Sequence, residues 1–278
     1  MKLYRSAIIL LPALACFTAC GVKSSSEAET MLSSIQSDIA AGHFQQAIAT
    51  MDSLDRRFPN ETAIRAEAIK LRPSAIEGAT IAEIASADSA IAATNKTIDS
   101  LAGEFTHIVN PALVENYHVI KSCKKPALMT STAIEPRVDE DYNFYIVASL
   151  QGKNIGLNSL TLTSGGLSAT TNVIPEGDER SFASALGQKA VFSEIDAEEL
   201  GILATKNKGN SATLTFNGRL GSKQITLSPS EVNGIADSYT FAKAHKTLLL
   251  AKIRREKLER QLQIARNQIA NMSPQSQE

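Results

Sequence analysis

The chain has 278 residues, of which 43% are hydrophobic and 21% are charged. These proportions are typical of globular proteins and argue against wholesale disorder, a collagen-like chain and a multi-span membrane protein. The 28 basic and 29 acidic side chains give a net charge of -1, so the chain as a whole does not attract nucleic acid. With three cysteines, four histidines and no tryptophan, a multi-cysteine zinc site, a disulfide framework and a tryptophan-lined sugar platform are all poorly supported.

Residues 1–19 have the layout of a secretory signal peptide. Lys2 and Arg5 form a short basic start, and the apolar run from Ala7 to Phe17 is too short to span a bilayer as a stable helix. Small residues then lead into Cys20. A cysteine at the cut site resembles the lipobox of bacterial lipoproteins, which implies cleavage before Cys20 and a diacylglycerol joined to its thiol. Several acyl chains make a durable anchor, because each buried methylene contributes about 0.8 kcal/mol.

Cys16 is an alternative lipidation site, because small and apolar residues at positions 13–15 precede it. We favour Cys20, which small residues flank on both sides and which the longer apolar run precedes. An ordinary cleaved signal or a buried apolar helix is the other interpretation. Residues 20–26 are expected to form a lipidated, flexible tether. Because glycine rather than aspartate follows Cys20, the resemblance to lipoproteins implies a lipid anchor in the outer membrane, with the chain facing the periplasm.

Cys123 would be the one free thiol of the lipidated chain. As a nucleophile it would need a base and an orienting group, but Lys121, Lys124 and Lys125 supply only positive charge nearby. We therefore favour a small apolar side chain in a strand over a catalytic cysteine.

Residues 27–106 are predicted to form a helical hairpin and a first stalk helix. Apolar residues recur at helical spacing on both sides of Gly42, which interrupts the pattern. The segment GHFQQAI resembles the second helix of a tetratricopeptide repeat, but a single repeat cannot form a peptide-binding groove, so we favour a structural hairpin. From Asn60 to Phe105, alternating spacings of three and four are typical of a coiled coil, and Pro73 is expected to kink or restart the helix.

Residues 228–272 are predicted to form a second stalk helix, followed by a disordered tail at 273–278. Ser228 and Glu231 make a capping box with proline at the first helical position. An apolar stripe at steps of three and four then continues to Met272, and a stripe of this length needs a partner helix.

Charge indicates which helix is the partner. Residues 243–266 carry eight basic and two acidic side chains, a balance of +6, whereas residues 27–104 carry twelve acidic and six basic ones, a balance of -6. We infer that the last helix runs antiparallel along Asn60 to Phe105 as the second side of one coiled-coil stalk. The rival interpretation is that its basic stretch KIRREKLERQ lies on anionic lipid or on nucleic acid, but export would remove nucleic acid as a partner.

Residues 107–227 have the composition of a β domain, with clustered Val, Thr, Tyr and Phe between glycines. A hairpin is expected at Asn217 to Gly221, and a capping box at Asp196 to Glu199 predicts a short helix. Short strands of this kind indicate an inserted antiparallel β-sandwich or barrel-like domain, and the fold class is therefore α+β. The predicted strands are Tyr117 to Ser122, Thr132 to Val138, Phe144 to Leu150, Ser159 to Thr163, Thr170 to Ile174, Ala190 to Phe192, Ala212 to Phe216 and Gln224 to Leu227.

Several segments occur in a recognisable order. They are the lipobox, the acidic helical segment, PRVDEDYNFYIVASLQGKNIG, TNVIPEGDERSF, a strand pair that ends in LSP and a basic terminal coiled coil. In this order they resemble a family of outer-membrane lipoproteins of the Bacteroidota. The resemblance implies the same architecture and supplies no reaction.

No familiar catalytic or cofactor motif occurs. His43, His107, His118 and His245 lack the spacing of a metal site such as HExxH, and there is no phosphate-cradling glycine loop or nucleotide fingerprint. We therefore expect no cofactor and no enzymatic activity.

The turn around DEDYNFY contains the remaining candidate site residues. Asp139 and Asp141 could hold a divalent cation, but we favour a solvated hairpin turn and predict no metal. Tyr142, Phe144 and Tyr145 could line a glycan patch, although alternate residues of a strand must face the core.

Two classes of function are consistent with these patterns. In the favoured one, a lipid-anchored and non-enzymatic envelope protein displays a β domain on a stalk, where it contacts another envelope protein or peptidoglycan. In the other, the β domain binds a glycan or small molecule, or is a hydrolase with an unfamiliar site. A deep cleft with converging polar groups would favour binding, and a filled core without one would favour the structural role.

Overall fold

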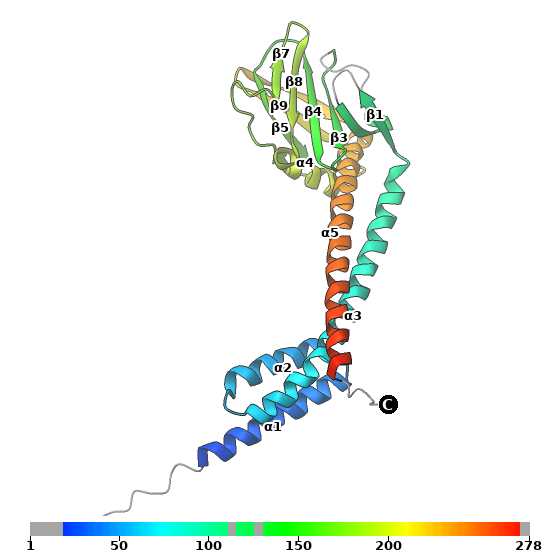
Figure 1. The fold of residues 1–278 in the computed structure, drawn as a ribbon. Coiled ribbons are helices and arrows are strands. Elements are labelled where there is room, and N and C mark those ends of the chain that lie inside the picture. Colours follow the sequence, from blue (N-terminus) through cyan, green and yellow to red (C-terminus); the bar gives the residue numbers. More distant parts are fainter. Residues whose placement is uncertain (1–18, 111–114, 125–129, 273–278) are drawn as a thin grey trace, which may run out of the picture. The chain divides into compact units, whose positions relative to one another are not determined.

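The computed structural model describes residues 19–110, 115–124 and 130–272 (Figure 1). In these residues it shows five α-helices and ten strands, and the strands form two antiparallel sheets. The α+β class and the long C-terminal helix predicted from the sequence are therefore confirmed. The chain divides into two compact units. We call residues 88–253 the β unit, and residues 1–87 with 254–278 the helical unit.

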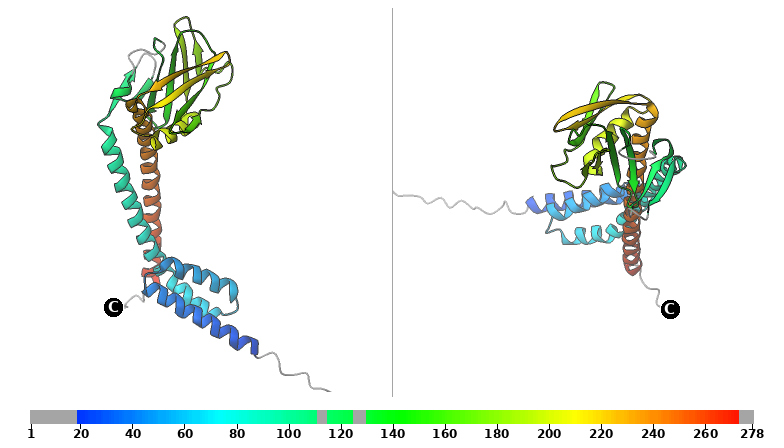
Figure 2. Two further views of the ribbon diagram at one scale, coloured as in Figure 1. Left: turned by 180° about the vertical axis from the view of Figure 1, so that it is seen from behind. Right: turned by 90° about the horizontal axis from the view of Figure 1, so that it is seen from above.

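The β unit contains a six-stranded and a four-stranded sheet, and each strand is antiparallel to its neighbours. In Figure 2 the yellow strands of the smaller sheet lie across the green strands of the larger one. The larger sheet has the order β1 (Phe105–Asn110), β2 (Glu115–Ile120), β3 (Ala133–Asp139), β4 (Phe144–Gln151), β8 (Gly187–Phe192) and β7 (Ser181–Ala183). The smaller sheet has the order β10 (Gly221–Leu227), β9 (Ala212–Gly218), β5 (Leu157–Ser164) and β6 (Leu167–Thr170).

One hydrophobic core serves both sheets. Phe144, Ile146 and Ala148, at alternate positions of β4, have no exposed surface. Leu162 of β5 and Phe216 of β9 are equally buried and belong to the same cluster. Burial of apolar surface at about 25 cal/mol per Å² is the main force that holds such a core together.

Two helices complete the core of the β unit. α4 (Glu194–Lys206) contacts β4 and β8 of the larger sheet and β5 and β6 of the smaller one. The first part of α5 (Pro229–Met272) contributes buried side chains to the same cluster. Gly201 allows α4 and α5 to approach closely, because a Cβ atom at this position would lie 2.5 Å from Cγ of Tyr239.

The helical unit begins with the predicted hairpin, formed by α1 (Ala19–Ala40) and α2 (Phe44–Arg57). Gly42 in the turn has a φ of +79°, a conformation that glycine adopts without steric cost. The amide of His43 donates a hydrogen bond to the carbonyl of Asp38 at 2.7 Å, which closes the end of α1. The core of this unit consists of Ala28, Ile35, Ala47, Met51, Leu54, Phe58, Ala68 and Ala75.

α3 (Thr62–Ala102) continues through Pro73 as one helix, so the chain does not restart at this proline. In the helical unit two ion pairs join α3 to the last part of α5. Arg254 lies 3.3 Å from Glu83, and Arg266 lies 2.9 Å from Glu77. None of the described helices combines the length and the apolar character that crossing a membrane requires.

Two predicted boundaries of the helical segments are wrong. Residues 20–26, expected to be a flexible tether, are helical because α1 already begins at Ala19. Apart from Gly21, no residue in this segment strongly opposes a helix, so α1 extends through it. At the other end, α3 stops at Ala102 instead of continuing to residue 106, because Phe105 begins β1 and its ring stacks on Phe241 at 4.3 Å.

Two predictions within the β region are also wrong. The strand expected at Thr170 to Ile174 does not form, because β6 ends at Thr170 and the hydroxyl of Thr171 accepts the amide hydrogen of Leu160 at 3.0 Å. The capping box of α4 consists of Ser193 and Asp196, so this helix begins earlier than the box expected at Asp196 to Glu199. The short strands β1, β6 and β7 were not predicted.

Most other sequence predictions in this region are confirmed. The capping box at Ser228 forms, with the hydroxyl of Ser228 accepting the amide hydrogen of Glu231 at 3.3 Å and the Glu231 carboxylate accepting that of Ser228 at 3.0 Å. The remaining predicted strands match β2, β3, β4, β5, β8, β9 and β10 to within a few residues. The predicted signal sequence up to residue 18, Cys16 within it, and the predicted tail at 273–278 lie outside the described residues.

Candidate functional site

Two histidines face each other across the first hairpin of the β unit. In the antiparallel pair β1 and β2, His107 lies directly opposite His118. Directly opposed residues share one face of a sheet, and these two imidazole rings stack with centroids 4.7 Å apart. Glu140, in the turn between β3 and β4, places Oε1 2.6 Å from Nε2 of His107. We call His107, His118 and Glu140 the histidine cluster; one ligand atom from each lies within 4.8 Å of the others.

Aromatic rings border the histidine cluster. Tyr142 lies parallel to His118 at 6.5 Å between ring centroids and stacks on His245 of α5 at 3.7 Å. Phe241 meets His245 edge-on at 4.5 Å and stacks on Phe105 at 4.3 Å. Three of the four histidines in the sequence thus share one aromatic region of the β unit.

The surroundings favour the neutral form of two of these imidazoles, because they lower both pKa values. Burial lowers the pKa of His118; His107 lowers it further, and Glu140 acts in the opposite direction. Burial also lowers the pKa of His245, with smaller contributions from His118 and Lys252. The buried Nε2 of His245 has no hydrogen-bond partner among the described residues.

The turn that carries Glu140 and Tyr142 is held by Asp139. Its carboxylate accepts hydrogen bonds from the amides of Asp141 at 2.9 Å and Asn143 at 2.7 Å, and from the side-chain amide of Asn143 at 2.8 Å. Tyr142 has a φ of +59° and is the one non-glycine residue with a positive φ in the described part of the chain. Such a conformation persists only where the surroundings enforce it, and it often marks a functional site.

A cleft with a volume of about 800 Å³ opens beside the same turn. Its walls come from β2, β4, β8, the β3–β4 turn, the start of α4 and the middle of α5. The lining residues are Glu115, Asn116, Asp139, Asn143, Phe144, Tyr145, Val191, Ser193, Glu194, Ile195 and Lys246. Four separate parts of the chain, at residues 115–116, 139–145, 191–195 and 246, therefore converge on one hollow in the β unit.

Charged and polar groups define the chemistry of the cleft. Nζ of Lys246 donates a hydrogen bond to Oδ1 of Asn143 at 2.8 Å and forms an ion pair with Glu194. With Glu115 and Asp139, the lining holds three carboxylates against one ammonium group, a balance of -2. Tyr145 lies at the same wall, and burial raises the pKa of its phenol to about 12.

A buried ion pair supports the Glu115 side of the cleft. Nε of Arg137 lies 2.6 Å from Oε1 of Glu135, and both side chains are almost fully buried. The guanidinium also reaches Glu115 at 3.4 Å and lies 3.8 Å from the centre of the Tyr117 ring. Although burial alone would lower the pKa of Arg137, the Glu135 carboxylate raises it above its usual value, so the guanidinium stays charged.

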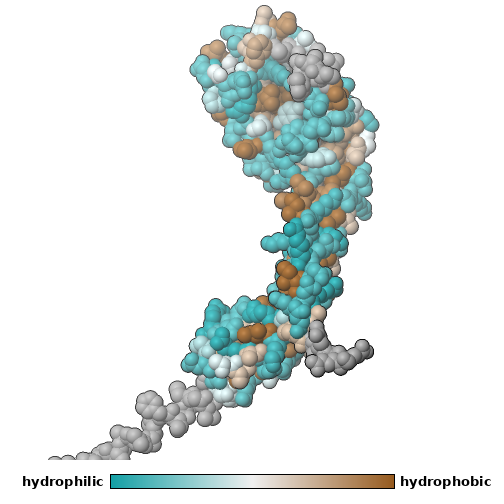
Figure 3. All heavy atoms as spheres, viewed as in Figure 1, coloured by the Kyte–Doolittle hydropathy of each residue, from teal (hydrophilic) through white to brown (hydrophobic). Residues whose placement is uncertain are grey.

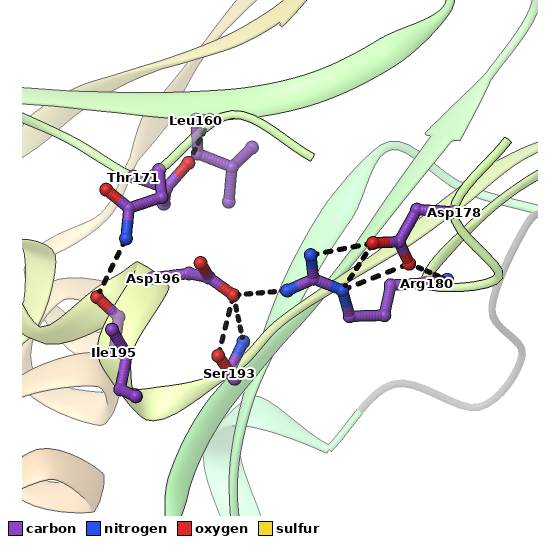
Figure 4. A network of polar contacts seen from close by, with 8 residues as sticks. Leu160, Thr171, Asp178, Arg180, Ser193, Ile195 and Asp196 are labelled. Atoms are coloured by element: carbon purple, nitrogen blue, oxygen red, sulfur yellow. Dashed lines mark hydrogen bonds and ion pairs between the residues drawn. The ribbon is translucent and has the colours of Figure 1, made fainter. Parts of the chain in front are cut away.

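A second polar network holds the start of α4, which forms another wall of the cleft (Figure 4). Arg180 contacts Asp178 at 2.8 Å and Asp196 at 2.7 Å. Asp196 also accepts hydrogen bonds from the amide of Ser193 at 3.1 Å and from its hydroxyl at 2.6 Å. Hydrogen bonds from Arg180 lower the pKa of Asp178. The loop before β7 is thereby tied to the first turn of α4.

Neither of the two predicted metal candidates, Asp139 and Asp141, belongs to the histidine cluster. The oxygens of Asp139 accept three hydrogen bonds inside the turn, and it is Glu140, between the two predicted aspartates, that lies beside the histidines. Asp141 is outside the group of ligand atoms. The predicted aromatic patch is divided in a similar way, because Tyr142 stacks on His245 whereas Phe144 and Tyr145 line the cleft.

Cys123 belongs neither to the lining of the cleft nor to the histidine cluster. The side chain of Cys123 is 2% exposed, and its Sγ would lie 2.1 Å from a Cβ atom placed on Gly234 of α5. This close packing fits the expected apolar role, although Cys123 follows β2 in a short 3-10 helix instead of lying in a strand. Cys20 is the second residue of α1, and Cys16 lies outside the described residues.

Sequence reasoning missed His107, His118 and Lys246 as site residues. A signal for the first two was present, since each histidine lies in a short run of β-branched and aromatic residues, FTHIV and YHVI, and a hairpin between two such strands can bring the histidines together. No comparable signal exists for Lys246, because its partners Asn143 and Glu194 come from distant segments. Comparison of this chain with protein-family models, with curated protein sequences and with solved structures found no match.

Proposed function

We propose that this chain is a lipid-anchored protein of the cell envelope whose β unit binds a small polar ligand in the cleft. The cleft carries this proposal. Its volume of about 800 Å³ falls within the roughly 300–1,000 Å³ that is typical of ligand pockets. Its mixture of apolar residues such as Phe144 and Val191 with a few convergent polar groups is also typical of such sites.

The lining chemistry favours a ligand that presents hydroxyl and amine groups. Carboxylates accept hydrogen bonds and attract cations, and three of them outnumber the single ammonium group of Lys246. The side-chain amides of Asn116 and Asn143 can donate to and accept from sugar hydroxyls. An amine-bearing sugar combines these features, and amino sugars are components of the bacterial envelope in which the proposed lipid anchor would place the protein.

The proposed role is binding without catalysis. Among the described residues that line the cleft there is no histidine and no cysteine. Ser193 is the one hydroxyl nucleophile of the serine or threonine type in this lining, and its hydroxyl donates a hydrogen bond to the capping residue Asp196 at 2.6 Å. Asp196 also pairs with Arg180 at 2.7 Å, so the Ser193 hydroxyl is part of the network that caps α4.

Glucosamine and N-acetylglucosamine test the proposal, because they differ in the charge of one nitrogen. Saturation-transfer difference NMR on the full chain is expected to show both sugars bound, with the cationic glucosamine bound more tightly. Ile195→Trp is expected to abolish the transfer, because Ile195 lines the cleft with 83% of its surface exposed and can accept a larger ring without disturbing the core.

Leu186→Trp is the matched control, since this leucine is 68% exposed and lies outside the cleft. It is expected to leave the binding of both sugars unchanged. Absence of saturation transfer from the wild-type chain to both sugars, or an equal loss in both variants, would count against a sugar site in the cleft.

A second candidate function is a structural or protein-interaction role. It is favoured by Leu249, Leu250 and Ile253 of α5, which are all more than half exposed. Figure 3 shows brown apolar patches of this kind on the otherwise hydrophilic surface of the long helices. Adjacent exposed leucine and isoleucine side chains are a common feature of surfaces that bind other proteins, and an envelope protein or peptidoglycan-associated protein would be the partner.

The finer architecture belongs to this proposal as well. We interpret the two sheets with their shared core as a sandwich, and α3 and α5 as two sides of an antiparallel stalk. The ion pairs of Arg254 with Glu83 and of Arg266 with Glu77 support the stalk. The later residue of α5 pairs with the earlier residue of α3, which is the order expected of antiparallel helices. These ion pairs agree with the opposite charges of the two helical segments.

A further inference from the structure

The histidine cluster combines three groups that are good metal ligands. His107 comes from β1, His118 from β2 and Glu140 from the β3–β4 turn, so three separate segments supply one ligand atom each within a span of 4.8 Å. Two imidazoles and one carboxylate are a ligand set that zinc ions use, with a water molecule in the fourth position. None of the three residues lines the cleft.

The backbone places these groups before any ion arrives. The register of β1 and β2 puts His107 and His118 opposite each other, and their rings are nearly parallel, with an angle of 23° between the planes. The three hydrogen bonds to the Asp139 carboxylate hold the turn on which Glu140 lies. A site held by strand register and a closed turn loses little conformational entropy when it binds an ion.

The cluster is also accessible from one side and bordered by rings on another. The side chains of His107 and Glu140 are 44% and 55% exposed, which leaves solvent access to their ligand atoms. Tyr142 and Phe241 lie 6.5 Å and 6.2 Å from the ring of His118. An apolar border of this kind lowers the local dielectric constant and strengthens the attraction between an ion and its ligands.

A simple ion pair does not account for the whole arrangement. The contact of 2.6 Å joins Nε2 of His107 to Oε1 of Glu140 and does not involve His118, so it does not explain why the His118 ring lies beside them. A metal ion uses all three. Bonds of about 2.0–2.2 Å in a tetrahedral site put ligand atoms roughly 3.3 Å apart. The cluster reaches that geometry if the hydrogen bond between His107 and Glu140 opens by less than about 1 Å while His118 turns inward.

We propose that His107, His118 and Glu140 bind one divalent transition-metal ion, with Zn²⁺ as the best fit. The site is independent of sugar binding in the cleft, so either proposal can fail alone. Imidazole and carboxylate ligands without a thiolate suit Zn²⁺ better than the softer Cu⁺, and the histidines select against Ca²⁺ and Mg²⁺, which prefer oxygen ligands.

Calorimetric titration of the full chain with ZnCl₂ tests this proposal. The protein is purified in detergent without a polyhistidine tag and is first treated with EDTA. One Zn²⁺ per chain is expected to bind, and the melting temperature is expected to rise in its presence because the ion binds the folded state. A wild-type chain that binds no Zn²⁺ would overturn the proposal.

Matched variants locate the ion. His107→Gln and Glu140→Gln alter exposed side chains, and each is expected to weaken Zn²⁺ binding by more than about ten-fold. Loss of a residue that only hydrogen-bonds to a metal ligand already weakens binding by about this factor, so loss of a ligand itself is expected to weaken it more. The controls are His43→Gln, in the turn between α1 and α2, and Glu179→Gln, which is exposed in the loop before β7. Both controls are expected to bind as tightly as the wild type. Equal binding by all four variants would show that the ion lies elsewhere and would overturn the assignment.

A spectroscopic measurement on the wild type does not depend on how well the variants fold. Co²⁺ is expected to replace Zn²⁺ and to show the intense visible absorption of a four-coordinate ion, which added Zn²⁺ removes. Weak absorption typical of six-coordinate Co²⁺ would contradict the proposed site. Circular dichroism in EDTA checks that each variant keeps the fold of the wild type before its affinity is compared.

Discussion

Tyr142 shows how one residue can be held in an unfavourable conformation by its neighbours. Its φ of +59° costs on the order of 1–3 kcal/mol for a residue with a bulky side chain. The ring stacks on His245 at 3.7 Å and borders His118, and the Asp139 carboxylate closes the turn around it. Stacking and turn hydrogen bonds together offset the strain, which places Tyr142 where it separates the ring of His118 from that of His245.

Tyr145 provides a prediction at the same scale. Burial raises the pKa of its phenol from 10.0 to about 12, partly opposed by the nearby Arg137. Between these pH values the unfolded chain loses the Tyr145 proton while the folded chain keeps it. The stability that this group contributes is therefore complete below pH 10 and is lost as the pH rises towards 12. Ultraviolet titration of the folded chain is expected to include a step near pH 12 from Tyr145, while burial also raises the pKa of Tyr117 and Tyr239.

Tyr145→Phe is expected to remove this late step and to leave the earlier phenolate absorbance unchanged. Tyr142→Phe is the comparison, because Tyr142 lies in the adjacent turn and not at the buried wall of the cleft. If the late step survived in Tyr145→Phe, the buried position assigned to this phenol would be wrong.

At the scale of elements, the sequence was sufficient to predict a helix end, a turn or a strand wherever one short-range pattern determined it. The capping box at Ser228, the break at Gly42 and most strands followed from short-range rules, because caps, turns and alternation act within a few residues. β1 was missed because Phe105 continues the apolar spacing of α3, whereas its pairing with Ile120 of β2 and its stacking on Phe241 show that it belongs to the larger sheet. The cleft and the histidine cluster depend on such long-range contacts throughout.

The end of α5 carries a prediction about the packing of helices. Ala265 is 1% exposed, next to Arg266 and its ion pair with Glu77 of α3. Ala265→Glu would bury a charge without a prepared partner, so it is expected to destabilise the helical unit by more than about 2 kcal/mol. Thermal unfolding followed by circular dichroism measures this loss.

Gln268→Glu on the same helix is the control, since Gln268 is exposed and glutamate suits a helix equally well. It is expected to change the melting temperature little. Equal stability of the two variants would mean that α5 is not packed along this side, and the stalk interpretation would then be wrong.

At the scale of the whole molecule, the chain combines a helical unit, built from residues 1–87 and 254–278, with a β unit that contains the cleft and the histidine cluster. The proposed anchor at Cys20 would join the helical unit to a membrane through lipid. Because Cys20 is the second residue of α1, little flexible chain would separate that lipid from the first helix. This differs from the tether that the sequence indicated, since six residues of flexible linker would have allowed much more movement.

Metabolic labelling with a fatty-acid analogue tests the anchor. Expression in bacterial cells that process lipoproteins is expected to label the wild-type chain and the variant Cys16→Ala, whereas Cys20→Ala is expected to carry no label. Transfer of the label to Cys16 would appear as full labelling of Cys20→Ala and its loss in Cys16→Ala. Absence of label from all three proteins would contradict the lipoprotein proposal.

The turn between β3 and β4 has a consequence for how the sequence can vary. Glu140 belongs to the histidine cluster and Tyr142 borders it, while Asp139 and Asn143 line the cleft. Most hairpin loops tolerate insertions because little depends on their length. Here a single added residue would shift groups in the cleft and in the histidine cluster together. Related chains that keep the proposed sugar binding or the proposed zinc binding are therefore expected to keep the length of this turn. The loop between β7 and β8, in contrast, is free to grow.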